Sequence, residues 1–228
     1  TRLWYRYEGG AWTDSGLSQG GASGTFDFNA PQGEGVYAFY TIATDLNGNV
    51  ENPPAGAQAN VLYDATKPVS SCTSISETNA VSVDIDFTAS DNDQVDRVSL
   101  WYSHDGGAWT DTGQTISAAS GTFTFTFADG DGLYGFYTVA QDMAGNVEDP
   151  PAAADTTVNL DQTMPESSCT AAPLVSQLPF QVQFTASDAG TGVASTKLWY
   201  RFAGETQWQD SYQTLTGESG TFLLDPIA

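Results

Sequence analysis

The sequence repeats itself with a fixed period of 97 residues. The loop DLNGNVENPP, which begins at Asp45, returns as DMAGNVEDPP at Asp142, and 142 − 45 = 97. The stretch SSCT likewise occurs at Ser70 and again at Ser167, which is 167 − 70 = 97 residues later. A period of this size is typical of a chain built from similar modules in tandem, so every other residue is interpreted within that repeat.

The repeat predicts one complete copy between two partial ones. The limits fall after Pro68 and Pro165, which gives a partial copy at residues 1–68, a complete copy at 69–165 and a partial copy at 166–228. The first copy lacks its opening strands and the third its closing strands. Both partial copies contain the strands between LWY and SGTF, so a head-to-tail exchange between chains would bring that set twice. We therefore expect the sequence to be a window onto a longer array.

Apolar side chains in the complete copy alternate with polar ones, which predicts β-strands. Val83, Ile85 and Phe87 alternate with Asp84 and Asp86, the pattern of a half-buried strand with an acidic outer face. Further strands are expected at FTFTF from Phe123, at LYGFYTVAQD from Leu133 and at VNL from Val158. About seven short strands in roughly 100 residues, separated by turn sequences, are typical of an immunoglobulin-type β-sandwich. The predicted fold class is thus all-β, with tandem immunoglobulin-like sandwiches of about 97 residues.

A tyrosine at the start of the penultimate strand supports this fold. EGVY ends at Tyr37 and DGLY ends at Tyr134, where the tyrosine corner of such sandwiches requires the residue. With FTASD, LWY, GGAWTD, SGTF and the D-x-T-x-P linker, the chain resembles the tandem immunoglobulin-like repeats of large bacterial and archaeal surface proteins. The resemblance covers all 228 residues and implies an extracellular, cell-surface location with a role in adhesion.

The charge excludes several classes of partner. With 28 acidic and 6 basic residues the formal net charge is −22, which repels phosphate backbones and anionic head groups. Nucleic acid is therefore not an expected partner. No apolar stretch approaches the roughly 20 residues that a membrane-spanning helix needs, so no membrane insertion is expected in this fragment.

Carboxylates from three separate segments are expected to meet where two repeats join. In an immunoglobulin-like topology, the loop after the second strand and the loop after the sixth strand lie at the pole that receives the preceding linker. Three negative charges this close repel one another unless a cation lies among them, and calcium accepts 6 to 8 oxygens. Calcium at such junctions is also a feature that the resemblance implies. The candidate ligands are Asp64, Asp91, Asp142 and Asn146, with Asp45, Asn49, Asp161 and Asp188 at the equivalent positions.

Turn capping or a saline habitat could also account for these acidic residues. Asp142 could simply cap the turn that follows it, because Asp side chains hydrogen-bond to backbone two residues on and Gly145 suits a positive φ. The overall acidity also fits a protein of a saline habitat. Turn capping explains Asp142 but not the recurrence of Asp91, Asp188 and the linker aspartate.

The sequence does not predict an enzyme. His104 is the one histidine, it lies in the turn SHDGG, and neither other copy has a counterpart. We expect it to be an exposed turn residue rather than a general base. No phosphate-binding glycine loop or paired-cysteine metal motif occurs.

Cys72 and Cys169 occupy equivalent positions in successive copies. A whole repeat separates them, which is too far for the short Cα separation of a disulfide. We expect both to be buried thiols in the first strand of their sandwiches, with intermolecular pairing as the alternative.

The tryptophan of the LWY stretch recurs in every copy, at Trp4, Trp101 and Trp199. If its neighbours face the core, these rings point outward and form a periodic surface for glycan stacking or lateral contacts between chains. The alternatives are that neighbouring side chains cover them, which we favour, or that a β-bulge breaks the alternation of the strand.

The sequence therefore predicts a structural element without catalysis: a stalk, an adhesin segment or part of a surface filament, rigidified by calcium at its junctions. The expected partners are other copies or neighbouring repeats, with surface glycans or proteins as further candidates. The alternative is an accessory carbohydrate- or ligand-binding module of a secreted enzyme. Such modules usually carry their ligand site once, whereas this chain repeats its junction residues.

Overall fold

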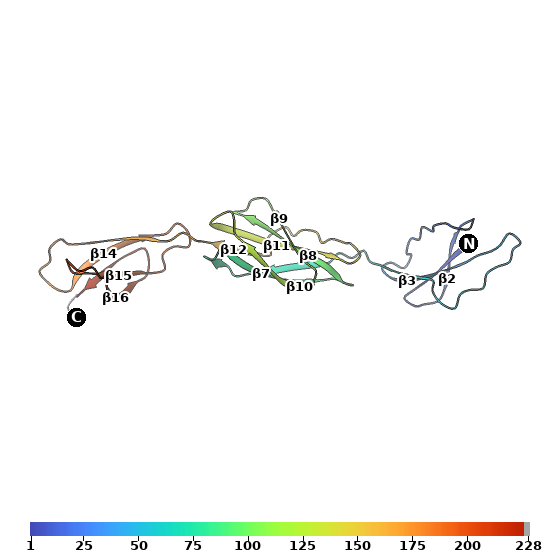
Figure 1. The fold of residues 1–228 in the computed structure, drawn as a ribbon, viewed down its shortest axis with the longest axis horizontal. Coiled ribbons are helices and arrows are strands. Elements are labelled where there is room, and N and C mark those ends of the chain that lie inside the picture. The colour runs from blue at the N-terminus through green and yellow to red at the C-terminus, as the bar shows by residue number, and fades with distance from the viewer. Residues whose placement is uncertain (226–228) are drawn as a thin grey trace.

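The computed structural model describes residues 1–225 and contains β-strands but no helix in that range. Figure 1 shows three groups of strands in a row, with the N-terminus at one end and the C-terminal region at the other. The all-β fold is thus confirmed. None of the described residues forms a helix that is long and apolar enough to cross a bilayer.

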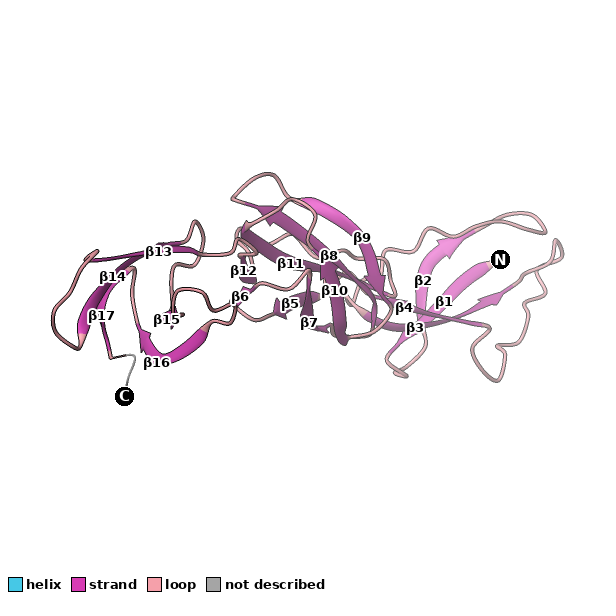
Figure 2. Ribbon diagram, turned by 60° about the vertical axis from the view of Figure 1, so that its left-hand side comes forward, coloured by secondary structure: helices cyan, strands magenta, loops and turns pink. Residues whose placement is uncertain are grey.

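The middle group is a sandwich of two sheets (Figure 2). The three-stranded sheet has the order β10-β7-β5 and the five-stranded sheet the order β6-β12-β11-β8-β9. Their bounds are β5 Val69–Thr73, β6 Glu77–Thr78, β7 Ser82–Ser90, β8 Val95–His104, β9 Thr110–Ile116, β10 Ser120–Thr126, β11 Gly132–Asp142 and β12 Thr156–Leu160. Neighbouring strands are antiparallel except β6 and β12.

The core of this sandwich follows the period-two pattern of the sequence. Ile85, Phe87 and Phe123 from one sheet pack with Phe136 and Val158 from the other, all at most 3% exposed. On the outer face, Thr124 and Thr122 of β10 donate hydrogen bonds of 2.9 and 2.6 Å to Asp84 and Asp86 of β7. The acidic face is therefore a ladder of cross-strand pairs rather than a row of bare charges.

The tyrosine corners form as the sequence predicts. The hydroxyl groups of Tyr37 and Tyr134 each donate a 2.8 Å hydrogen bond to a backbone carbonyl four residues earlier, Gly33 and Gly130 respectively. Both rings are at most 1% exposed, so the hydroxyl group needs such an acceptor.

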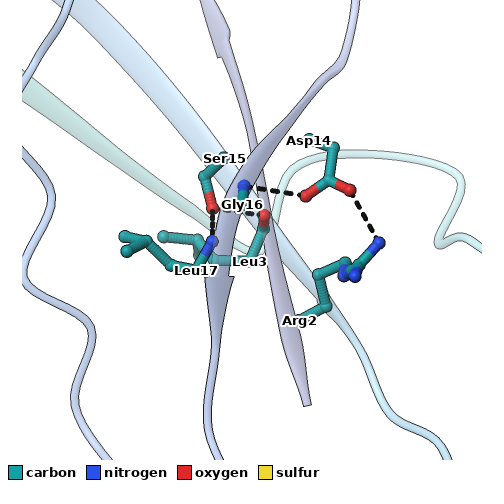
Figure 3. Close-up of polar contacts among 6 residues, drawn as sticks. All are labelled: Arg2, Leu3, Asp14, Ser15, Gly16 and Leu17. Carbon is teal, nitrogen blue, oxygen red and sulfur yellow. Dashed lines mark hydrogen bonds and ion pairs between the residues drawn. The ribbon is translucent and has the colours of Figure 1, made fainter.

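A β-bulge recurs in each group beside the tryptophan of the LWY stretch, opposite residues that the sequence analysis did not single out. In β2, Ser15 Oγ donates to the Leu3 carbonyl at 2.6 Å and accepts from the Leu17 N–H, while Asp14 accepts the Gly16 N–H at 2.9 Å (Figure 3). Gly16 has a φ of 75°, which favours glycine. The same contacts recur around Thr112 and Ser211, so the signal DSG, DTG, DSY marks the bulge.

The outer groups have fewer strands. The first is one sheet of order β2-β1-β3-β4, with β1 Arg2–Tyr7, β2 Thr13–Ser18, β3 Gly35–Ile42 and β4 Ala59–Tyr63. The third has a sheet of order β13-β14-β17 and the pair β15-β16, with β13 Glu166–Ala171, β14 Phe180–Ser187, β15 Thr196–Tyr200, β16 Gln209–Leu215 and β17 Ser219–Leu224.

The two cysteines differ in exposure, which corrects the expectation that both are buried. Cys72 is 2% exposed, because β11 and the side chain of Asp155 lie over it. Cys169 is exposed. Among residues 1–225, no carboxylate or strand covers Cys169 as Asp155 and β11 cover Cys72.

The thiols should therefore react at different rates. Burial and the neighbouring Asp155 carboxylate raise the pKa of the Cys72 thiol well above its usual value, so little thiolate forms there. We expect native protein to react with one equivalent of a thiol reagent quickly and a second only in denaturant. Cys169→Ser should remove the fast phase and Cys72→Ser should leave it. Two slow thiols in the native chain would contradict the exposure of Cys169.

Candidate metal centre

Three carboxylates from three segments meet where the first group of strands joins the second. Asp64 follows β4, Asp91 follows β7 and Asp142 ends β11. One oxygen of each lies within 4.8 Å of the others, and no other group of three carboxylate, cysteine or histidine side chains in residues 1–225 is as close. Asp64 is 9% exposed and Asp142 is 2% exposed. The arrangement therefore brings together three of the residues chosen from the sequence.

Two oxygens of this cluster are buried without a hydrogen-bond partner within the described chain. They are Asp64 Oδ2 and Asp91 Oδ1. A buried carboxylate oxygen without a donor is costly, so such atoms are rare in folded proteins and usually face an ion or water. Oxygen ligands from carboxylates suit a hard divalent cation such as calcium. The donor set thus fits a cation in number, chemistry and burial.

Asp142 has a second role, as the cap of the following turn. Its Oδ1 accepts the N–H groups of Gly145 and Asn146 at 2.7 and 2.8 Å, and its Oδ2 accepts Asn146 Nδ2 at 2.8 Å. Burial opposes ionisation, but these hydrogen bonds outweigh it and hold the pKa of Asp142 below its usual value. Turn capping and membership of the cluster therefore coexist in one side chain.

Asn146 ties the linker to this turn. Its Nδ2 donates to the Asp64 carbonyl at 3.2 Å as well as to Asp142. The amide group thus contacts two of the three acidic residues through its nitrogen, and its contribution to the cluster is a donor that links two segments.

Other residues at this junction were not identified from the sequence. The Glu34 carboxylate accepts the Ala65 N–H and the Thr66 hydroxyl at 3.0 and 2.8 Å. Asn92 Nδ2 lies 3.3 Å from Asp64 Oδ1, and Lys67 forms an ion pair with Asp149 at 2.5 Å. The signal that could have found Glu34 is its position before the corner tyrosine, which the next copy fills with Asp131.

Asp131 repeats the role of Glu34 at the second junction. It accepts the N–H groups of Gln162 and Thr163 at 2.9 and 3.1 Å and the Thr163 hydroxyl at 2.6 Å. The hydrogen bond from the Thr163 side chain, with those from the backbone, holds the pKa of Asp131 below its usual value. A carboxylate on the loop before β3 or β11 thus fixes the linker in both places.

At the second junction the structure brings together two of the predicted residues. Asp161 Oδ2 accepts the N–H and hydroxyl of Thr191 at 2.5 and 2.7 Å, and these bonds lower the pKa of Asp161. Asp188 Oδ2 accepts the N–H groups of Gly190 and Gly192, while its Oδ1 is buried without a partner in residues 1–225. Within residues 1–225, no third carboxylate completes a cluster here like that of Asp64, Asp91 and Asp142.

Asp45 and Asn49 form a turn like that of Asp142 and Asn146. Asp45 Oδ1 accepts the N–H groups of Asn47 and Asn49, and Asn49 Nδ2 donates to Asp45 Oδ2 at 2.7 Å. The Asn49 side chain is the main reason why the pKa of Asp45 lies below its usual value.

The recurrent tryptophans lie on the outer face of the sheets. Trp4 and Trp101 are half-buried and stack on tyrosines of the neighbouring strand, Tyr40 and Tyr137, with ring centroids 6.0 and 5.9 Å apart. Trp199 is 49% exposed, and its main ring neighbour is the Lys197 ammonium at 5.2 Å. The exposure of each tryptophan therefore depends on whether the neighbouring strand places a tyrosine ring against it.

His104 is less exposed than its turn sequence suggests. Its ring packs 4.5 Å from that of Tyr134, and Nε2 lies 3.2 Å from the Asp131 carbonyl. His104 therefore packs against the ring of the corner tyrosine, so its role is in packing.

Comparisons with known proteins give only distant likenesses. No model of a protein family matches the sequence, and no curated protein sequence matches it. The FN1–FN3 domains of chicken CNTN1 align over 97% of this chain and 80% of theirs, with 11% identity and a TM-score of 0.33. A tetra-tandem repeat from the extending region of a large adhesion protein aligns over 97% of this chain, with 18% identity and a TM-score of 0.34. The chain spans 57% of that repeat structure. At TM-scores this low, neither likeness bears on what the chain does.

Acid should destabilise the middle sandwich partly through Asp142. Its pKa is lower in the folded state than the value of about 3.9 in an unfolded chain. The ionised group therefore stabilises the fold above that pH, and the contribution is lost as the pH falls through the folded pKa. In calcium-free buffer, we expect Asp142→Asn to have a lower melting temperature than the wild type at neutral pH. Its melting temperature should also fall by less than that of the wild type when the pH is lowered. Asp93→Asn is the charge-matched control on an exposed side chain. Equal acid losses in Asp142→Asn and wild type would contradict this role.

Proposed function

We propose that this chain is a structural segment of an extracellular array of immunoglobulin-like repeats, divided after Pro68 and Pro165, and that calcium rigidifies its junctions. Such a segment acts without catalysis, as a stalk, adhesin segment or filament element whose partners are neighbouring repeats. The observation that supports the proposal is the cluster of Asp64, Asp91 and Asp142, with two buried oxygens that have no partner in residues 1–225.

Calcium is the cation that suits this donor set best. It takes only oxygen ligands, in a flexible shell of 6 to 8, whereas magnesium demands a small octahedral site and keeps several waters. The cluster holds carboxylates alone, without the sulfur or imidazole that zinc and copper favour. Asp64 Oδ2, Asp91 Oδ1 and a carboxylate oxygen of Asp142 would be the protein ligands, with carbonyls or water for the remainder.

A cation here would connect three segments that otherwise repel one another. Asp64 belongs to the linker, while Asp91 and Asp142 belong to two loops of the following sandwich. Binding all three would fix the angle between successive repeats, in addition to the hydrogen bonds of Asn146 and Glu34 to the linker. A stiff junction in a repeated chain gives an extended rod, which is what a stalk or filament requires.

Thermal unfolding with and without calcium tests the proposal. A ligand that binds only the folded state stabilises it, by about 2.7 kcal/mol at a hundredfold excess over its Kd. We expect calcium to raise the melting temperature of the middle sandwich, chelator to reverse the rise, and magnesium to act more weakly. The best variant is Asp91→Asn, because its amide oxygen can still accept the Asp93 N–H at 3.0 Å while one ligand charge is lost.

Asp91→Asn should abolish most of the calcium-dependent rise in melting temperature. The matched control is Asp93→Asn. It removes one negative charge from an exposed side chain two residues after Asp91, and it should keep the calcium-dependent rise. The site would be refuted if the melting temperature did not change with calcium or chelator, or if both variants lost the calcium-dependent rise equally. Turn capping would then remain as the role of Asp142.

A further inference from the structure

The aspartate that caps each β-bulge has one carboxylate oxygen left for a second partner. Oδ1 of Asp14, Asp111 and Asp210 accepts the N–H of the residue two positions later, at 2.9, 2.8 and 2.8 Å respectively. In the first group, Oδ2 of Asp14 pairs with Arg2 at 2.8 Å (Figure 3). In the third group, Oδ2 of Asp210 pairs with Lys197 at 2.6 Å. A basic side chain of the neighbouring strand thus binds the second oxygen in both outer groups.

The middle repeat has this aspartate without the base. Ser99 holds the position that Arg2 or Lys197 has in the outer groups, two residues before the tryptophan of LWY. Within residues 1–225, Asp111 forms no ion pair, and its one hydrogen bond is the bulge contact of Oδ1. The one lysine or arginine of this repeat is Arg97, which pairs with Asp96 at 2.9 Å. The Oδ2 atom of Asp111 therefore has no cation from its own repeat.

A tryptophan ring lies beside the same carboxylate. Trp101 is the partner of Asp111 in the β8–β9 pair, as Trp199 is the partner of Asp210 in the β15–β16 pair. In the third group the cation contacts both partners, because Lys197 Nζ lies 2.6 Å from the carboxylate and 5.2 Å from the centre of the tryptophan ring. An ammonium group is stabilised by a carboxylate and by the face of an indole. The middle repeat has both of these partners for an ammonium group.

The position of the missing base is open to solvent. Asp111 is exposed, and Ser99 and Trp101 are half-buried. Burial and, after it, the negative charge of Asp111 raise the pKa of Tyr137, the tyrosine on which Trp101 stacks. The carboxylate thus acts on the aromatic rings of this face, and a cation from outside can reach both.

A second position for a cation in the outer groups is closed in the middle repeat. Arg6 and Arg201 lie 4.8 and 4.7 Å from the ring centres of Trp12 and Trp208. The equivalent residue of the middle repeat, Ser103, is 7% exposed. Of the two positions, the one beside the bulge aspartate is therefore the one that a cation from outside can reach.

We propose that Asp111 and Trp101 form a binding site for a lysine side chain of another protein. The lysine would take the place that Lys197 has in the third group, with its ammonium group donating to Asp111 Oδ2 and lying against the Trp101 ring. This site goes beyond the proposed structural function. It lies on the outer face of β8 and β9, so it would give a rod of repeats a lateral contact that does not involve the junction carboxylates.

The charge of the chain indicates what kind of partner carries that lysine. The chain has 28 acidic and 6 basic residues, so it attracts a basic protein and repels a second copy of itself. Its own two lysines, Lys67 and Lys197, already form ion pairs within the chain. The expected partner is therefore a basic protein with exposed lysines.

Nuclear magnetic resonance of the full 228-residue chain tests the site with the peptide acetyl-Gly-Lys-Gly-amide at low salt. The indole N–H signal of Trp101, assigned by its loss in Trp101→Phe, should shift and saturate with the peptide. One exposed ion pair with a cation–π contact is weak, so we expect a Kd on the order of tens of millimolar. The same peptide with norleucine in place of lysine should leave the signal unmoved.

Three substitutions locate the bound ammonium group. Ser99→Lys supplies the base from within the repeat, as Lys197 does, and should weaken peptide binding at least about fivefold. Ser120→Lys is the matched control, because it adds the same charge at an exposed position of β10, in the other sheet, and should leave the Kd within about twofold. Asp111→Asn can still accept the Gly113 N–H and should also weaken binding at least about fivefold.

Circular dichroism shows whether each variant folds like the wild type. The proposal is overturned if the Trp101 signal does not respond to the lysine peptide, or if the norleucine peptide shifts it equally. It is also overturned if Ser99→Lys and Ser120→Lys weaken binding to the same extent, because the peptide would then respond only to the net charge. None of these outcomes depends on calcium, so they leave the test of the proposed function separate.

Discussion

Electrostatic repulsion among Asp64, Asp91 and Asp142 is the constraint on which the junction depends. Two unit charges 4 Å apart interact by about 4 kcal/mol near a protein surface, and the cluster holds three within 4.8 Å. Hydrogen bonds from Gly145 and Asn146 offset this for Asp142, but one oxygen each of Asp64 and Asp91 is left without a donor in residues 1–225. A bound cation would remove the repulsion and join the linker to both loops, and the proposed function rests on this cluster.

The same chemistry explains much of the acidity of the chain. Many carboxylates accept backbone N–H groups that no strand or turn satisfies: Glu34 and Asp131 hold the linkers, and Glu148 and Asp155 bridge β5 to β11. Asp84 accepts a threonine hydroxyl across the sheet. A net charge of −22 is thus in part the result of using ionised acceptors as structural connections, because charge-assisted hydrogen bonds are the stronger ones.

The sequence predicted what depends on local pattern and on topology. Period-two alternation located β7 and β10, and the immunoglobulin-like topology brought Asp64, Asp91 and Asp142 together from three distant segments. It failed for Cys169, which is exposed although its equivalent Cys72 is buried, and it missed Glu148 and Asp155, whose partners in β5 lie about 80 residues away. Contacts of that kind are set by how the sheets pack, which no local pattern records.

Diffraction from crystals grown with calcium, recorded at a wavelength where calcium scatters anomalously, tests the central claim most directly. The account predicts an anomalous peak between the carboxylates of Asp64, Asp91 and Asp142, with oxygens at about 2.3–2.6 Å from the ion. An ordered junction without a peak there, in crystals that hold calcium at saturating concentration, would contradict it.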